Sequence, residues 1–190
     1  MADALKKADD AEKARKEADA KKKAEVKVEK KADVLALPWK IDALKEMAMG
    51  TVATYAVSGT DAKGKEVTDQ FIATFKGGDD KSARVNEYRV SKKDDPVSGQ
   101  TKTLDWSQLS PLFSVERAES KVLRKESVQV AAGSFETTVV EITGFFGAHQ
   151  TVWMIDDKPG IYAKVESHPN ANEEGDQTAM VYELEKLETK

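Results

Sequence analysis

Two histidines, His149 and His168, are the residues of this chain best suited to general-base chemistry or to binding a borderline metal ion. There is no cysteine, which excludes disulfides, thiol chemistry and cysteine-ligated metal. The histidines do not form an HxH or HExxH pattern, and no carboxylate stands at a ligand spacing from either. Each lies beside an expected turn. We therefore expect two solvated loop histidines, no bound metal and no cofactor.

Carboxylates gather at four expected turns, where a calcium site would need alternating oxygen donors and a glycine at the bend. None of the four groups has that register, so we expect solvated turn carboxylates. The groups are Asp79-Asp80, Asp94-Asp95, Asp156-Asp157 and Glu173-Glu174-Gly175-Asp176.

Nucleophile and phosphate-binding motifs are also missing from the sequence. It contains no GxSxG, Walker or GxGxxG pattern, and Gly144–Gly147 encloses two aromatic residues instead of forming a phosphate loop. With no catalytic constellation to name, we predict that the protein is not an enzyme.

Aromatic side chains within expected strands are the remaining candidates for a site. Two interpretations stay open: the rings fill the core of a small barrel, or some of them line a cavity that holds a lipid-like ligand. The ligand-cavity candidates are Tyr55, Phe71, Phe75, Trp153 and Tyr182.

Charge and hydropathy limit the partners. The 190 residues carry a formal net charge of -4, which argues against general nucleic-acid binding. The unbroken apolar runs are far shorter than the ~20 residues that span a bilayer. We therefore expect no nucleic-acid partner and no membrane-spanning helix.

The first 33 residues differ from the rest in composition. They contain nine Ala, 11 Lys or Arg and nine Asp or Glu, all but the aspartates good helix formers, with pairs such as Glu12–Lys16 at i, i+4 spacing. Their apolar stripe of alanines is too thin to bury much area. We predict a charged helical tether at 1–33 and a β-rich domain at 34–190.

A short helix and a series of strands are expected in the domain. Pro38 suits a first helical turn, Ile41, Leu44, Met47 and Ala48 share one side, and Gly50 can end the helix. Residues 92–103 read as a polar loop, and Leu104–Leu112 as one or two helical turns. Period-two patterns predict about eight strands, at 51–58, 67–75, 83–91, 121–130, 135–143, 150–155, 161–167 and 178–187.

Short turns between these strands favour an antiparallel meander. A twisted sheet of that many strands must curl, close or split into two layers. The predicted fold is therefore mainly β: a curled antiparallel meander or half-open barrel of about eight strands with one or two short helices, preceded by the charged N-terminal helix. In the hairpin Ala131–Ser134 we expect Gly133 at positive φ and Phe135 facing inward.

Three segments carry a resemblance to a known group. They are TLDWSQLSPLFS (Thr103–Ser114), ESVQVAAGSFETTVVEI (Glu126–Ile142) and TVWMIDDKPGIYAKVE (Thr151–Glu166). Together with GTVATYAVSGTDAKGK (Gly50–Lys65), they resemble uncharacterised bacterial envelope proteins, periplasmic or lipoprotein-like, with a "VPAGTF"-like hairpin. The chain departs from that pattern at Ala131, Ala132 and Met154.

This resemblance implies an exported protein of the periplasm or cell envelope and no established catalytic residues. Met1-Ala2-Asp3-Ala4 has no apolar run of a signal peptide, so we expect that an export or lipid-anchoring segment has been removed, with a cytoplasmic location as the alternative. The function expected is non-catalytic binding or scaffolding, with an envelope protein or a hydrophobic small molecule as partner. A lipid carrier is the alternative, and an enzyme without a recognisable motif comes third.

Overall fold

The computed structural model describes residues 36–91, 99–106, 110, 112, 119–144, 148–170 and 172–189. Residues 35–190 form one compact unit. The predicted helical tether at 1–33 lies outside the described residues and stays a prediction.

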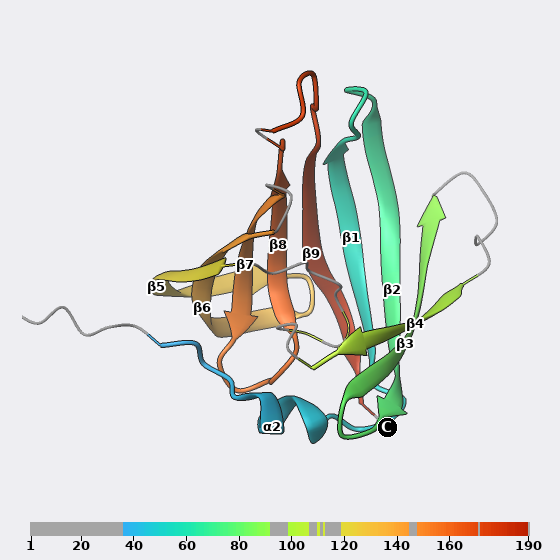
Figure 1. Ribbon diagram of the computed structural model, residues 1–190, viewed down its shortest axis with the longest axis vertical. Coiled ribbons are helices and arrows are strands. Elements are labelled where there is room, and N and C mark those ends of the chain that lie inside the picture. The colour runs from blue at the N-terminus through green and yellow to red at the C-terminus, as the bar shows by residue number, and fades with distance from the viewer. Residues whose placement is uncertain are drawn as a thin grey trace, which may run out of the picture. The chain divides into compact units, whose positions relative to one another are not determined.

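One antiparallel sheet of nine strands makes up the described part of this unit, in the order β4-β3-β2-β1-β9-β8-β7-β6-β5 (Figure 1). β4 and β5 stand at opposite ends of that order, so the sheet is open, and the predicted curled, mainly β fold is confirmed. The elements are α2 (Ile41–Lys45), β1 (Val52–Thr60), β2 (Glu66–Gly78), β3 (Ser82–Ser91), β4 (Gln100–Asp105), β5 (Glu119–Val130), β6 (Gly133–Thr143), β7 (His149–Ile155), β8 (Tyr162–His168) and β9 (Ala179–Glu188).

The centre of the sheet is the pairing of β1 with β9, which joins a meander of β1–β4 to a meander of β5–β9. Val57 lies opposite Tyr182 in this pair, and the register shifts between Thr54 and Tyr55. Gly59 has φ +138°, and a Cβ there would lie 1.9 Å from the carbonyl oxygen of Ala179. Only glycine therefore fits where the two central strands approach each other.

Alternation along β1 and β2 places their fully buried side chains on one face, as the period-two pattern predicts, whereas Val52 and Ile72 lie on the other. Tyr55 is paired with Phe71, and Ala53 with Ala73. Since directly paired residues of antiparallel strands share a face, we call this side of the sheet the Tyr55 face. The opposite side of β6–β8, which carries Trp153, is called the Trp153 face.

Buried aromatic rings and their polar atoms connect the core. Tyr55 donates its hydroxyl to the carbonyl oxygen of Tyr162 at 3.1 Å, and the Trp39 indole N–H donates to the carbonyl of Ile155 at 2.8 Å. The rings of Trp39 and Tyr162 stack with centroids 5.8 Å apart. Burial raises the pKa of Tyr55 far above its ordinary value, so this phenol stays neutral and acts as a donor.

The predicted short helix is present as α2, but its apolar side is narrower than expected. Leu44 is 3% exposed, whereas Ile41 is 51% exposed and Ala48 is also exposed. Gly50 follows at φ +91° and donates its N–H to the carbonyl of Phe75 at 2.8 Å. Leu44 belongs to the core cluster, and residues 46–51 connect the helix to β1 (Figure 1).

One strand was missed in the sequence. The sequence predicts a loop at residues 100–103 and helical turns at Leu104–Leu112, but Gln100–Asp105 is the edge strand β4, with Leu104 opposite Ala83. Leu104 is its only buried side chain, because an edge strand needs little apolar surface. Most of the remaining predicted helical segment lies outside the described residues.

The β5–β6 hairpin has the predicted glycine, with Gly133 at φ +138° and Val130 paired with Gly133. Ala132 in its tip donates its N–H to the carbonyl of Leu184 on β9 at 3.1 Å. Phe135 is not fully inside the core as predicted; it lies half-buried at the edge of the core. The reason is its position near the hairpin tip, beyond the most deeply buried part of β6.

We expect Gly133→Val to lower the free energy of unfolding by more than about 1 kcal/mol, because a β-branched side chain is strained at positive φ. Ser134→Ala changes an exposed neighbour and should stay within about 0.5 kcal/mol of the wild type. Urea unfolding of the two variants measures both values. Equal stability of the two variants would contradict the turn geometry.

Candidate ligand-binding site

Three of the five aromatic candidates lie in a row on the Tyr55 face. The rings of Tyr55 and Phe71 have centroids 6.2 Å apart, and Phe71 meets Tyr182 edge-on at 6.1 Å. Tyr55 is fully buried, whereas Phe71 and Tyr182 are half-buried. Because β1, β2 and β9 are neighbours in the sheet, residues far apart in the sequence form one aromatic surface.

Arg89 on β3 extends this row, since it lies directly opposite Phe71. Its Nη2 donates to the hydroxyl of Tyr182 at 2.9 Å, and its guanidinium carbon lies 5.8 Å from the centre of the Tyr182 ring. The nearest ion-pair partner is Asp69, at 4.0 Å from Nε, which is the outer limit for an ion pair. The Arg89 side chain is 40% exposed, so a solvent-accessible cation stands beside two half-buried rings.

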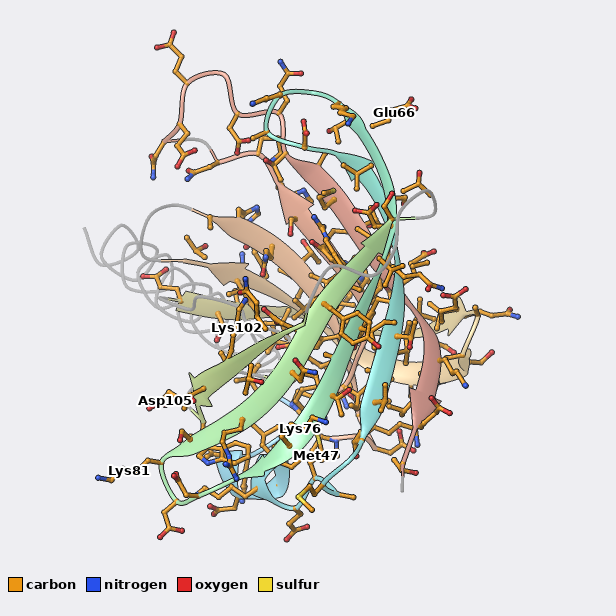
Figure 2. All side chains as sticks on the ribbon, turned by 90° about the vertical axis from the view of Figure 1, so that its right-hand side faces the viewer. Met47, Glu66, Lys76, Lys81, Lys102 and Asp105 are labelled. Atoms are coloured by element: carbon orange, nitrogen blue, oxygen red, sulfur yellow. The ribbon has the colours of Figure 1, made fainter. Side chains whose placement is uncertain are left out.

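A second ion pair borders this surface on the side of the edge strand. Lys102 of β4 contacts the carboxylate of Glu87 on β3, next to Arg89 on the same face. Figure 2 shows Lys102 on β4, and Glu66 and Lys76 towards the two ends of β2. We call Phe71, Arg89 and Tyr182, with Asp69, the Arg89 site.

The other two aromatic candidates are elsewhere. Phe75 is 2% exposed and meets Trp106 with ring centroids 6.2 Å apart, while the Trp106 indole donates to the carbonyl of Asp79 at 2.7 Å. Phe75 therefore belongs to the packed core at the α2 end of the sheet. Trp153 lies on the opposite face of the sheet, away from the aromatic row.

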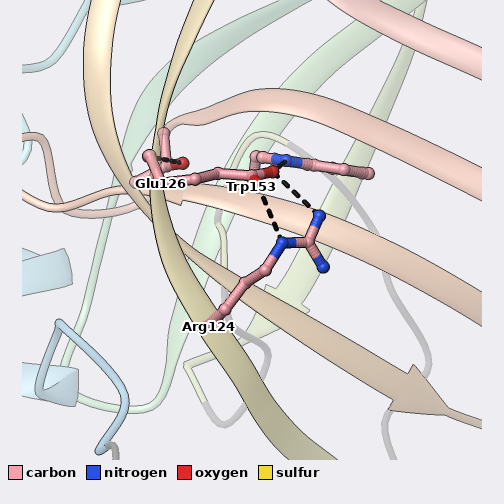
Figure 3. Close-up of polar contacts among 4 residues, drawn as sticks. Arg124, Glu126 and Trp153 are labelled. Atoms are coloured by element: carbon pink, nitrogen blue, oxygen red, sulfur yellow. Dashed lines mark hydrogen bonds and ion pairs between the residues drawn. The ribbon is translucent and has the colours of Figure 1, made fainter.

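Trp153 is held by charged side chains of β5, which lies two strands away, and of the adjacent β8 (Figure 3). Its indole N–H donates to Oε1 of Glu126 at 2.6 Å, and the Arg124 guanidinium donates to both Glu126 oxygens, at 2.8 and 2.9 Å. The Lys164 ammonium lies 5.1 Å from the centre of a Trp153 ring. These contacts cover the indole, which is only 6% exposed, so Trp153 serves packing in this conformation.

The hydrogen bonds from Arg124 first, and then from the Trp153 indole, hold the pKa of Glu126 below its usual range. Both partners stabilise the carboxylate form. The group is therefore a source of stability that depends on its staying ionised.

The sequence predicts that both histidines lie in loops, but the structure places neither of them there. His149 begins β7 and His168 ends β8, and the two are directly opposite each other in the sheet. The reason is that β7 begins one residue earlier, and β8 ends one residue later, than the sequence pattern predicts. Within the described ranges, no three His, Asp or Glu side chains form a group that could hold a metal ion.

Arg89 and its ion-pair partner Asp69 are the residues of this site that are not among the sequence candidates. The signal was present: Ala83, Val85, Glu87 and Arg89 alternate along one strand, so charged residues continue an apolar face. Glu87 and Arg89 alone do not indicate a site, because charged residues are common in solvent-exposed strands. The pairing of Arg89 with Phe71 is what shows that they border an aromatic row.

Further along the sheet, a shallow groove of about 470 Å³ lies between the β5–β6 hairpin tip and the end of β9. Phe135, Lys158 and Leu187 are among its lining residues. The groove is separate from the Arg89 site, since the two share no residue. In the part of the chain that the structure describes, no helix is long and apolar enough to cross a membrane.

We expect Glu126→Gln to flatten the acid limb of the stability profile. Because the folded-state pKa of Glu126 is lowered, its contribution is present above the ordinary glutamate pKa of about 4.3 and is lost as pH falls through the folded-state value. Thermal midpoints measured from pH 7 to pH 2 should fall less steeply in the variant, which starts from a lower midpoint at pH 7. A variant profile parallel to that of the wild type would contradict this role.

Comparison with known proteins gives two solved structures of low similarity, and no family model or curated protein sequence matches the chain. One is a candidate exported protein with a YmcC-like fold from Bacteroides fragilis, with a TM-score of 0.46, 9% identity, and coverage of 75% of this chain and 97% of that one. The other is a candidate lipoprotein from Parabacteroides distasonis, with a TM-score of 0.44, 10% identity, and coverage of 75% and 96%. At these values, the activity of this chain must be argued from its own residues.

Proposed function

We propose that this protein is a non-catalytic binding domain of the cell envelope, whose Arg89 site takes an amphipathic small molecule with a carboxylate or phosphate group. The observation that carries the proposal is the position of Arg89. Its guanidinium is solvent-accessible, lies over the Tyr182 ring, and has its nearest carboxylate, Asp69, 4.0 Å away. The envelope location comes from the sequence resemblance and is part of the proposal.

The guanidinium supports an anionic ligand group. Arginine carries five N–H donors in a planar fork, which matches the two oxygens of a carboxylate or phosphate. In this site one of these donors is bonded to the Tyr182 hydroxyl, which fixes the orientation of the fork. The long contact with Asp69 costs little to replace, because an exposed ion pair contributes only about 0–1 kcal/mol.

The rings support an apolar ligand body beside that group. Phe71 and Tyr182 are half-buried and meet edge-on, so an aliphatic or aromatic group on the Tyr55 face would remove further apolar surface from water. Each square ångström so removed is worth about 25 cal/mol. Tyr55 and Leu184 beside them on the same face are fully buried, so the ligand would lie on the face, not within the core.

A scaffold that binds an envelope protein is the other function expected from the sequence. The Arg89 site favours a small ligand over that role because its cation and rings are grouped within one short row. A partner protein would instead need an interface of roughly 1,200–2,000 Å² in total.

The test uses 8-anilinonaphthalene-1-sulfonate, an amphipathic anion whose fluorescence reports binding. We expect Arg89→Gln to weaken its affinity about tenfold or more, because a hydrogen bond to a charged group is worth about 1.5–3 kcal/mol. Tyr182→Phe removes only the hydroxyl that orients Arg89 and should weaken binding less.

Arg84→Gln is the matched control, because Arg84 lies on the same strand but points to the opposite, exposed face. Thermal midpoints of all three variants establish that each is folded at the temperature of the titration. Equal affinities of Arg89→Gln and Arg84→Gln would refute the Arg89 site.

A further inference from the structure

The chain's two imidazole rings are nearest neighbours across β7 and β8. His149 lies directly opposite His168, and the ring centroids are 5.2 Å apart with planes inclined by 39°. Neither ring belongs to the Arg89 site, since alternation along β7 puts His149 on the Trp153 face. The pair is therefore an independent feature of the sheet.

The Nε2 atom of each ring lies close to a side chain of the adjacent row of paired residues on the same face. Nε2 of His149 lies 3.1 Å from Oε1 of Glu141 on β6, and Nε2 of His168 lies 3.1 Å from Oγ1 of Thr151 on β7. Thr151 is itself paired with Glu141 on one side and with Glu166 on the other. Two nitrogens, one hydroxyl and two carboxylates thus lie on adjoining rows of one face.

From this arrangement we propose that His149 and His168 form an open, two-imidazole site for a borderline divalent transition-metal ion, of the class of Ni²⁺, Cu²⁺ and Zn²⁺. Imidazole is a preferred ligand of these ions, whereas Ca²⁺ and Mg²⁺ prefer sites built from oxygen alone. Glu141 adds negative charge beside the pair, whereas the charge of Glu166 is balanced by Lys164 at 2.7 Å. Water or a further ligand completes the coordination, because only two protein side chains bind directly.

The sheet fixes the backbone of this site. The backbone positions of both histidines are fixed by the β7–β8 pairing, so rotation about side-chain bonds is enough to turn both Nε2 atoms towards one ion. The His149 side chain is 37% exposed, which leaves a path for the ion from solvent. An ion held by both strands also stabilises their pairing, because it binds the folded state more tightly than the unfolded chain.

The composition makes the proposal easy to test. The chain has no cysteine and no third histidine, so a tag-free protein offers no other pair of strong ligands for a borderline ion. After treatment with a chelator and its removal, the full chain is titrated with Ni²⁺ and with Zn²⁺ in a calorimeter. We expect one ion per chain.

Substitution of either histidine should remove the site. We expect His149→Gln and His168→Gln each to weaken Ni²⁺ affinity at least tenfold, and Glu141→Gln to weaken it less. Glu136→Gln, which changes an exposed carboxylate elsewhere on β6, is the matched control and should bind as the wild type does. At 100 times the dissociation constant, the ion should raise the wild-type thermal midpoint by about 5–10 °C.

The spectrum of bound Cu²⁺ gives a second readout that does not depend on stability. Two coordinating imidazoles produce nitrogen hyperfine splitting from two rings in electron paramagnetic resonance, and each single variant should show one ring at most. Wild-type affinity in either histidine variant would overturn the proposal. Calcium binding at the same affinity as Ni²⁺ would also overturn it, because it would assign the ion to the carboxylates.

Discussion

The pairing of β1 with β9 is the constraint on which the rest of the structure depends. These strands come from the two ends of the β-rich region, and each belongs to a different meander. Without this pairing, β1 and β9 would each be an edge strand, with one side lacking a hydrogen-bonded neighbour. The close approach at Gly59 and the register shift at Tyr55 show that this junction is closely specified. Long-range pairing of this kind must meet its loop-closure cost before its contacts form, so we expect the β1–β9 pairing to form late in folding.

The Arg89 site exists only because of that junction. Phe71 and Arg89 come from the first meander and Tyr182 from the last strand, and the row closes when β9 lies beside β1. The hydrogen bond from Arg89 to the Tyr182 hydroxyl crosses from β3 to β9. This hydrogen bond can therefore form only when β1 and β9 are paired.

The sequence predicts the strands well where one face is buried. It predicts them poorly at an edge strand with little burial and at a strand buried on both faces. Alternation placed Tyr55 and Phe71 on one face, and the glycine of the β5–β6 hairpin was expected at positive φ. β4 was missed because an edge strand with one buried leucine has the composition of a loop. On β6, Val139 and Val140 are both fully buried, so this strand has core on both faces and alternation cannot say which side a residue takes.

The same limits apply to the two candidate sites. Of the five aromatic candidates, three meet and two do not, because their grouping depends on which strands are neighbours. The histidines lie 19 positions apart in the sequence, and no local spacing rule connects them. A cross-strand pair depends on register, and a shift of one residue would turn one ring to the other face. Thr151 and Trp153 follow His149 on the same face of β7, so the face that carries the indole towards Glu126 also carries the His149 ring towards His168, and the β7–β8 register brings the two imidazoles together.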